Sequence, residues 1–184
     1  MKTNIDVLTA LQSGVPGGYS DLVTRRTGAV VRMVIERQIN GLADGTVVFL
    51  DFSHIGVLDH SCADEFVAKL MLPLTREHPS HDGYVVFNGI SVDHLETIEA
   101  VLETHGLALV VQFEGSTQLV GAVTTEERAC WQLVMLHGAS IPETVALHTG
   151  VPDEACRALL ESLARRRLLR RDADRFFPLG TAPA

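Results

Sequence analysis

The four residues Asp59-His60-Ser61-Cys62 bring a carboxylate, an imidazole, a hydroxyl and a thiol together between an apolar strand pattern and a helical pattern. At the start of a helix, the free backbone amides and the helix dipole favour negative charge. A phosphate group on Ser61 would be stabilised there, and such an added charge can switch a binding contact. The run therefore makes Ser61 a candidate phospho-acceptor on which a switch could be built.

A hydroxyl N-cap is the competing interpretation of Ser61. With Asp64 three residues later, Ser61 imitates a capping box in which Asp replaces the usual Glu or Gln. Capping alone accounts for a serine at a helix start, so we favour the N-cap over the phospho-acceptor. The two roles use the same exposed amides and are compatible in principle.

Other polar residues near this run give no sign of catalysis. Asp51 ends an apolar strand without a catalytic partner at motif spacing, so a hydrogen-bonded acid is expected there. Four histidines match no ligand template of a zinc site, and we expect surface histidines and no metal: His54, His60, His78 and His81. No nucleotide-binding glycine motif follows a strand, and no nucleophile–base pair stands out. We therefore expect no enzyme and no cofactor.

Strand and helix patterns alternate through the first two thirds of the chain. Strands are predicted at residues 4–10, 45–52, 84–88, 108–113 and 118–123. Helices are predicted at residues 19–40, 61–70 and 93–106. Ser20 or Asp21 would cap the first helix, and Gly41 would end it. The second strand is almost wholly apolar, which is typical of a strand covered on both faces. This order indicates an α/β layered domain with a central sheet.

One segment resembles the strand–loop–helix of STAS domains, the fold of anti-sigma factor antagonists; it reads Leu50-Asp51-Phe52-Ser53-His54-Ile55-Gly56-Val57-Leu58-Asp59-His60-Ser61. The long preceding helix and the continuation Ala63-Asp64-Glu65-Phe66 are still more similar to the STAS-like family. In that family a strand ending in Leu-Asp-Phe leads to a Ser-rich turn and an Ala-Asp-Glu helix. The resemblance covers residues 4–122. It implies that Ser61 matches a serine phosphorylated by a kinase of the histidine-kinase-like ATPase fold, and that phosphorylation weakens binding to this kinase.

The chain departs from the antagonist pattern at the turn, which reads Asp-His-Ser-Cys where antagonists usually read Asp-Ser-Ser-Gly. The cysteine adds a side chain where a kinase loop would approach. The resemblance still implies a protein-binding surface formed by the turn and the helix after it. Its candidate residues are Asp59, His60, Ser61, Cys62 and Glu65.

Composition places the chain among ordinary globular proteins, since 46% of its 184 residues are hydrophobic and 21% are charged. No apolar run approaches the roughly 20 residues that span a bilayer, and the N-terminus lacks the apolar core of a signal peptide. Cys62, Cys130 and Cys156 form no CxxC pair and are predicted to be reduced thiols. We therefore expect a cytoplasmic protein that does not contact membranes.

Charge divides the chain into two parts. Residues 1–124 contain 7 Lys and Arg against 15 Asp and Glu, whereas residues 125–184 contain 8 of each. The change falls at Gly121-Ala-Val-Thr-Thr125, just before a new helical pattern. We therefore predict a STAS-like α/β domain at residues 1–122 and a second, smaller domain at residues 123–184.

The second domain is predicted to contain three helices and a β-hairpin. A helix is expected at residues 124–137, a second at 143–148 opened by a capping box at Ser140, and a third starting at Pro152. Two short strands would follow around Asp172-Ala-Asp174. This order resembles the winged helix-turn-helix of bacterial regulators.

A DNA-binding transcription regulator is the alternative function. A recognition helix reads bases through its first residues, which here are Asp153 and Glu154, and DNA phosphates would repel both acids. Arginines suited to DNA contacts are Arg157, Arg165, Arg166, Arg170, Arg171 and Arg175. Because a fold of this kind also serves protein contacts, we favour a non-enzymatic regulatory module. The expected partner is a protein, a histidine-kinase-like ATPase, and a homodimer is left open.

Overall fold

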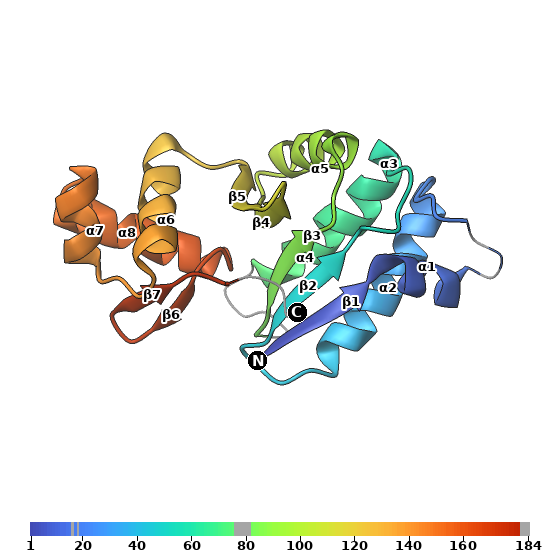
Figure 1. The fold of residues 1–184 in the computed structure, drawn as a ribbon, viewed down its shortest axis with the longest axis horizontal. Helices are drawn as coiled ribbons and strands as arrows, with labels where there is room; N and C mark the ends of the chain where they lie inside the picture. Colours follow the sequence, from blue (N-terminus) through green and yellow to red (C-terminus); the bar gives the residue numbers. More distant parts are fainter. Residues whose placement is uncertain (16, 18, 76–81, 181–184) are drawn as a thin grey trace.

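A five-stranded sheet forms the centre of the molecule in the computed structural model, which describes residues 1–15, 17, 19–75 and 82–180 (Figure 1). The strands are β1 (Lys2–Asp6), β2 (Val47–Asp51), β3 (Tyr84–Asn88), β4 (Ala108–Phe113) and β5 (Ser116–Gly121), and they lie in the order of the chain. The first four pair in parallel, and β5 pairs antiparallel with β4. The predicted mixed α/β class is confirmed.

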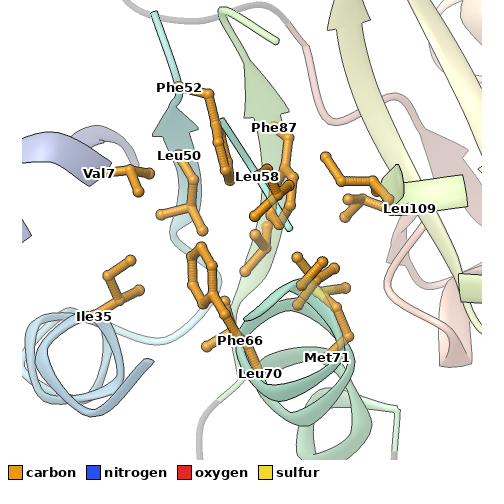
Figure 2. Close-up of a cluster of buried hydrophobic side chains, with 14 of the residues drawn as sticks. Val7, Ile35, Leu50, Phe52, Leu58, Phe66, Leu70, Met71, Phe87 and Leu109 are labelled. Atoms are coloured by element: carbon orange, nitrogen blue, oxygen red, sulfur yellow. The ribbon is translucent and has the colours of Figure 1, made fainter. Parts of the chain in front are cut away.

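The strand order places the crossover helices on one face of this sheet. These are α1 (Val7–Gly14), α2 (Arg25–Asn40) and α5 (Val92–Thr104), together with one long helix built from α3 (His60–Ala63), a π-helical segment (Asp64–Ala68) and α4 (Lys69–Leu74). Right-handed crossovers between strands in chain order all pass over the same face. Phe52, Phe66 and Phe87 fill the core between this helical layer and the sheet (Figure 2).

The remainder of the chain packs against the other face of the sheet at strands β2 to β5. It comprises α6 (Thr125–His137), α7 (Pro142–Thr149), α8 (Asp153–Arg165) and a hairpin of β6 (Arg170–Asp172) and β7 (Arg175–Phe177). The three predicted helices and the hairpin are therefore confirmed. Phe49 and Val86 point from the sheet into the core that Trp131 and Leu160 share. This shared core explains why the predicted strands are apolar on both faces.

The start of the chain differs from the strand predicted at residues 4–10. The strand β1 ends at Asp6, and helix α1 begins at once. Asp6 ends the strand because its carboxylate accepts a hydrogen bond from the amide of Leu8 at 3.0 Å, which is the geometry of an N-cap.

The cap predicted for helix α2 is also wrong. Thr24, not Ser20 or Asp21, precedes the first helical residue and accepts a hydrogen bond from the amide of Thr27. Asp21 is used elsewhere, because its carboxylate accepts a hydrogen bond from the amide of Val57. Gly41 ends the helix as predicted.

The capping box predicted at Ser140 does not form. Ser140 exchanges two backbone hydrogen bonds with Phe176 of the hairpin, at 3.0 and 2.9 Å. This pairing buries Ser140 and leaves Ile141 as the residue before helix α7, without a side-chain cap.

Among the described helices, none is long and apolar enough to cross a membrane.

Candidate functional site

The N-cap of helix α3 is Asp59, so the prediction that Ser61 caps this helix is wrong. One carboxylate oxygen of Asp59 accepts hydrogen bonds from the backbone amide of Ser61 at 2.8 Å and from that of Cys62 at 3.1 Å. Asp59 occupies the cap because its backbone is extended at ψ 146° and its short side chain reaches both amides. The capping box with Asp64 is therefore absent.

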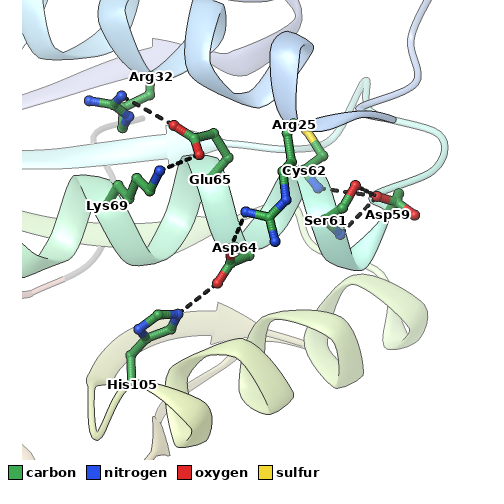
Figure 3. A network of polar contacts seen from close by, with 9 residues as sticks. All are labelled: Arg25, Arg32, Asp59, Ser61, Cys62, Asp64, Glu65, Lys69 and His105. Carbon is green, nitrogen blue, oxygen red and sulfur yellow. Dashed lines mark hydrogen bonds and ion pairs between the residues drawn. The ribbon is translucent and has the colours of Figure 1, made fainter.

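Ser61 is instead the second residue of the helix, and its hydroxyl donates a hydrogen bond to the same Asp59 oxygen. This hydrogen bond and the two from backbone amides hold the pKa of Asp59 below its ordinary value. Asp59 and Ser61 are both partly exposed, whereas His60 is exposed. The turn thus presents a charged carboxylate and a serine hydroxyl side by side (Figure 3).

The loop before Asp59 is held by a second segment of the chain. Leu22 pairs with Leu58, with one hydrogen bond from the amide of Leu22 to Val57 and one from the amide of Asp59 to Leu22. His94 of helix α5 lies 2.8 Å from the carbonyl oxygen of Gly56 through its Nε2 atom. These contacts fix the approach to the helix start.

Backbone strain is located in this same second segment. Thr24 has φ +80°, a conformation that is rare for a β-branched residue. Such strained residues persist only where the surrounding structure holds them, and they cluster at functional sites. Here Thr24 joins the strand pairing at Leu22 to the start of helix α2, which packs on the site.

Helix α2 approaches the site at Gly28. A Cβ atom on Gly28 would lie 2.6 Å from the carbonyl oxygen of Cys62 and 3.2 Å from its sulfur. Glycine is therefore needed for the two helices to touch. Cys62 is fully buried in this contact, and burial raises the pKa of its thiol to about 12, with the charges of Asp59 and Glu65 adding to the effect.

Asp64 joins three helices just after the turn. Its two carboxylate oxygens contact Arg25 of α2 at 2.7 Å and Nε2 of His105, the residue after α5, at 2.6 Å (Figure 3). The hydrogen bond with His105, followed by that with Arg25, lowers the pKa of Asp64. The carboxylate thus fixes the position of the helix start relative to its neighbours.

Glu65, the next residue, forms a second ion-pair group. Its carboxylate contacts Lys69, one turn later, and Arg32 of helix α2 at 3.3 Å. Only 8% of the residue is exposed, and the contact with Lys69 is the main reason that its pKa is lowered. Glu65 therefore supports the helix, whereas Asp59, His60 and Ser61 present the surface.

Asp51 is the hydrogen-bonded acid that was predicted. Its carboxylate accepts hydrogen bonds from the amide of Ser53 at 2.9 Å and from the Ser53 hydroxyl at 2.6 Å. The same arrangement of a carboxylate and a serine two residues later thus occurs at Asp51 and at Asp59. Only the second begins a helix.

The six arginines that the sequence suggested for DNA contacts differ in the partners they have in the structure. Arg157 pairs with Glu143 at 2.6 Å, Arg166 with the buried Glu127 at 3.2 Å, and Arg171 with Glu161 at 3.5 Å. Arg170 covers the ring of Phe177, whereas Arg165 and Arg175 are exposed and have no acidic partner among the described residues. Half of the six arginines are therefore paired with acids.

Metal binding receives no support from the described part of the chain, where no three His, Cys, Asp or Glu side chains converge. His54 is exposed and lies 3.8 Å from Asp6. His78 and His81 fall outside the described residues.

Sequence reasoning missed the partners that hold the turn. Arg25 is 39 residues from Asp64, and His105 is 41 residues from it, so no local pattern connects them. The pairing of Glu65 with Lys69 has the spacing of one helical turn and could have been found from sequence.

Comparison with protein-family models, curated proteins and solved structures finds no match to this chain in any of the three.

Proposed function

We propose that this chain is a non-enzymatic regulatory module that binds a protein partner through Asp59, His60 and Ser61, the accessible residues of the turn. The observation that carries the proposal is the Ser61 hydroxyl, which is accessible at a helix start and hydrogen-bonded to a carboxylate. In this proposal residues 1–122 form a STAS-like domain. Helices α6, α7 and α8 and the β6–β7 hairpin form a winged-helix-like unit.

Exposed apolar side chains beside the turn favour a protein partner. Tyr19, Val23 and Val57 are exposed by 85%, 41% and 54%, and their segments are hydrogen-bonded to each other next to Asp59. Apolar and aromatic residues surrounded by polar groups are typical of protein-binding surfaces. A small charged ligand would make no favourable contact with these apolar side chains.

Phosphorylation of Ser61 would change this surface because two anions would compete for the same amides. Asp59 already occupies the amides of Ser61 and Cys62, so a phosphate on Ser61 would have to displace it or be repelled by it. Displacing Asp59 would loosen the turn that Leu22 and Leu58 hold. The modification would thus weaken partner binding by rearranging the turn as well as by adding charge.

We infer that the partner is a histidine-kinase-like ATPase, as the resemblance of the turn implies. The test incubates the purified full chain with ATP and a purified histidine-kinase-like ATPase from the same organism, and follows phosphate incorporation by intact mass. The wild-type chain should accept one phosphate and Ser61→Ala none. Binding of the ATPase to immobilised chain should weaken after phosphorylation and in Ser61→Asp.

Ser53 provides a matched control, because its hydroxyl makes the same contact with Asp51 as Ser61 makes with Asp59. Ser53→Asp should leave ATPase binding unchanged. Equal loss of binding in Ser53→Asp and Ser61→Asp, or phosphate incorporation into Ser61→Ala, would contradict the proposal.

A further inference from the structure

A concave site lies between the end of helix α8 and the sheet. It has a volume of about 680 Å³, and Tyr84 and Asp82 line one wall while α8 and the hairpin line the other. Small-molecule sites typically have volumes of roughly 300 to 1,000 Å³. Tyr84 begins strand β3, whereas the Asp59 turn follows the far end of the neighbouring strand β2. The cleft is therefore a second site, separate from the turn.

Positive charge predominates in this cleft. Its lining includes Arg165, Arg166, Arg167 and Arg171. The carboxylates in the lining are those of Asp82 and Glu161. Even when the buried partner of Arg166, Glu127, is added, guanidinium groups outnumber carboxylates. This excess is notable in a chain whose formal net charge is −8, and it attracts anions.

The guanidinium group of Arg165 is available to a ligand, and that of Arg171, whose Nε donates a hydrogen bond to Ala173, keeps further N–H donors beside Glu161. Arg165 is exposed and has no acidic partner among residues 1–15, 17, 19–75 and 82–180. Arg171 lies 3.5 Å from Glu161, and both side chains are about 40% exposed, so this pair contributes little. An anion with several oxygen atoms could bind both guanidinium groups through paired hydrogen bonds.

Arg167 holds the wall of the cleft at a conformational cost. After helix α8 the amide of Arg167 bonds to Ala164 and that of Leu168 to Leu163, which is a Schellman motif with Arg167 at φ +61°. Glycine is the usual residue at this position because it adopts positive φ without strain. A residue persists in such a conformation only where the surrounding structure holds it.

The side chain of Arg167 connects the two walls of the cleft. Its guanidinium group lies 2.5 Å from Asp82 and 5.6 Å from the ring centre of Tyr84, so it joins the end of α8 to the sheet. Its Nε atom is buried and has no hydrogen-bond partner in the described structure. Arg167 therefore positions the two walls, and its charge is only partly satisfied by the half-exposed Asp82.

We propose that this cleft binds a small ligand that carries a diphosphate or longer phosphate chain. Arg165 and Arg171 contact the phosphate oxygens, and Arg167 positions the cleft between α8 and strand β3. A polyphosphate fits better than a single carboxylate because it offers many acceptor oxygens and several negative charges to forked donors on two elements. The concave shape favours a small molecule over a nucleic acid strand.

The experiment titrates the full chain with inorganic pyrophosphate at low and at moderate salt and records amide NMR shifts and calorimetric heats. We expect saturable binding that shifts residues of the α8 end, the hairpin and Tyr84. Arg165→Gln should weaken binding by about tenfold, because it removes a charged hydrogen bond from an exposed side chain without disturbing the fold. The double variant Arg165→Gln/Arg171→Gln should weaken it further.

Arg175→Gln is the matched control, because Arg175 is an exposed, unpaired arginine in the described hairpin that does not line the cleft. It should bind pyrophosphate like the wild type. Absence of saturable binding, or equal affinity in Arg165→Gln and the wild type, would overturn the proposal. A short DNA duplex that binds more tightly than pyrophosphate and is weakened equally by Arg165→Gln and Arg175→Gln would overturn it in favour of a nucleic acid surface.

Discussion

Asp59 controls the chemistry of the turn through a single carboxylate oxygen. That oxygen accepts hydrogen bonds from two backbone amides and from the hydroxyl of Ser61. Ser61 therefore does not cap the helix, although a serine at a helix start usually does. Its contribution to stability is one hydrogen bond to a carboxylate that the helix already holds. This leaves the hydroxyl replaceable, as a modification site requires.

Ser61→Ala should lower the free energy of unfolding by only about 0.5–1.5 kcal/mol, the usual net contribution of one hydrogen bond. Urea unfolding followed by far-ultraviolet circular dichroism measures this value. Ser53→Ala, which removes the equivalent hydroxyl beside Asp51, should have a similar effect. Asp59→Ala should cost more, because it removes the cap itself. A greater loss for Ser61→Ala than for Asp59→Ala would contradict the assignment of Asp59 as the cap.

Acid should destabilise the fold through the carboxylates around the turn. The pKa values of Asp64 and Glu65 are lowered from ordinary values of 3.8 and 4.5, so the folded state favours their charged forms. Their stabilising contribution is complete above the ordinary values and is lost as pH falls through the lowered ones. The free energy of unfolding should therefore decrease below about pH 5.

Urea unfolding at a series of pH values tests this dependence. Glu65→Gln should reduce the slope of stability against pH, because one of the titrating groups is removed. Glu36→Gln is a suitable control, since Glu36 pairs with the same Arg32 but is more exposed. Identical slopes for Glu65→Gln and the wild type would show that the Glu65 ion pairs do not contribute.

Among the elements, helices α2 and α3 determine the position of the turn because they touch at Gly28. The contact brings Arg25 within reach of Asp64 and buries Cys62. The helix that begins at the turn is not uniform, since a π-helical segment at Asp64–Ala68 separates α3 from α4. π-helical segments within longer helices occur frequently at functional sites.

Gly28→Ala should destabilise the protein by about 1–3 kcal/mol, because the added methyl group must push the backbone of Cys62 away. Thermal unfolding measures the loss. Gly41→Ala is a control, because the nearest atom to its added Cβ would be an ordinary 3.5 Å away. Equal melting temperatures for Gly28→Ala and the wild type would mean that the two helices can move apart without a loss of stability.

On the scale of the whole molecule, the sheet has two differently built faces. The crossover helices cover one face, and α6, α7, α8 and the hairpin cover the other. The residues after 122 share their core with the sheet, and Arg166 ties the two parts by a hydrogen bond to the carbonyl oxygen of Ala122. The turn after β2 and the cleft at the start of β3 lie at opposite ends of these two neighbouring strands.

A chain truncated after residue 122 should expose the apolar side chains that point from the sheet toward Trp131. Exposed apolar surface of this extent causes association, so the truncated chain should bind the dye ANS and aggregate. Light scattering and dye fluorescence measure both effects. A monomeric truncated chain without dye binding would show that residues 1–122 form an independent unit.

Local pattern was sufficient for the elements whose signal lies within a few residues. The strands β3 and β4, helix α6 and the hairpin follow from apolar periodicity and turn residues, and residues 45–52 indicated a strand covered on both faces. The sequence by itself also located the polar turn. Only the tertiary structure decided that Asp59, and not Ser61, is the cap, that Ser140 pairs with the hairpin, and that four arginines line one cleft. The physical reason is range: periodicity and capping act over three or four residues, whereas these contacts join residues that are distant in sequence or depend on the exact backbone angle at one position.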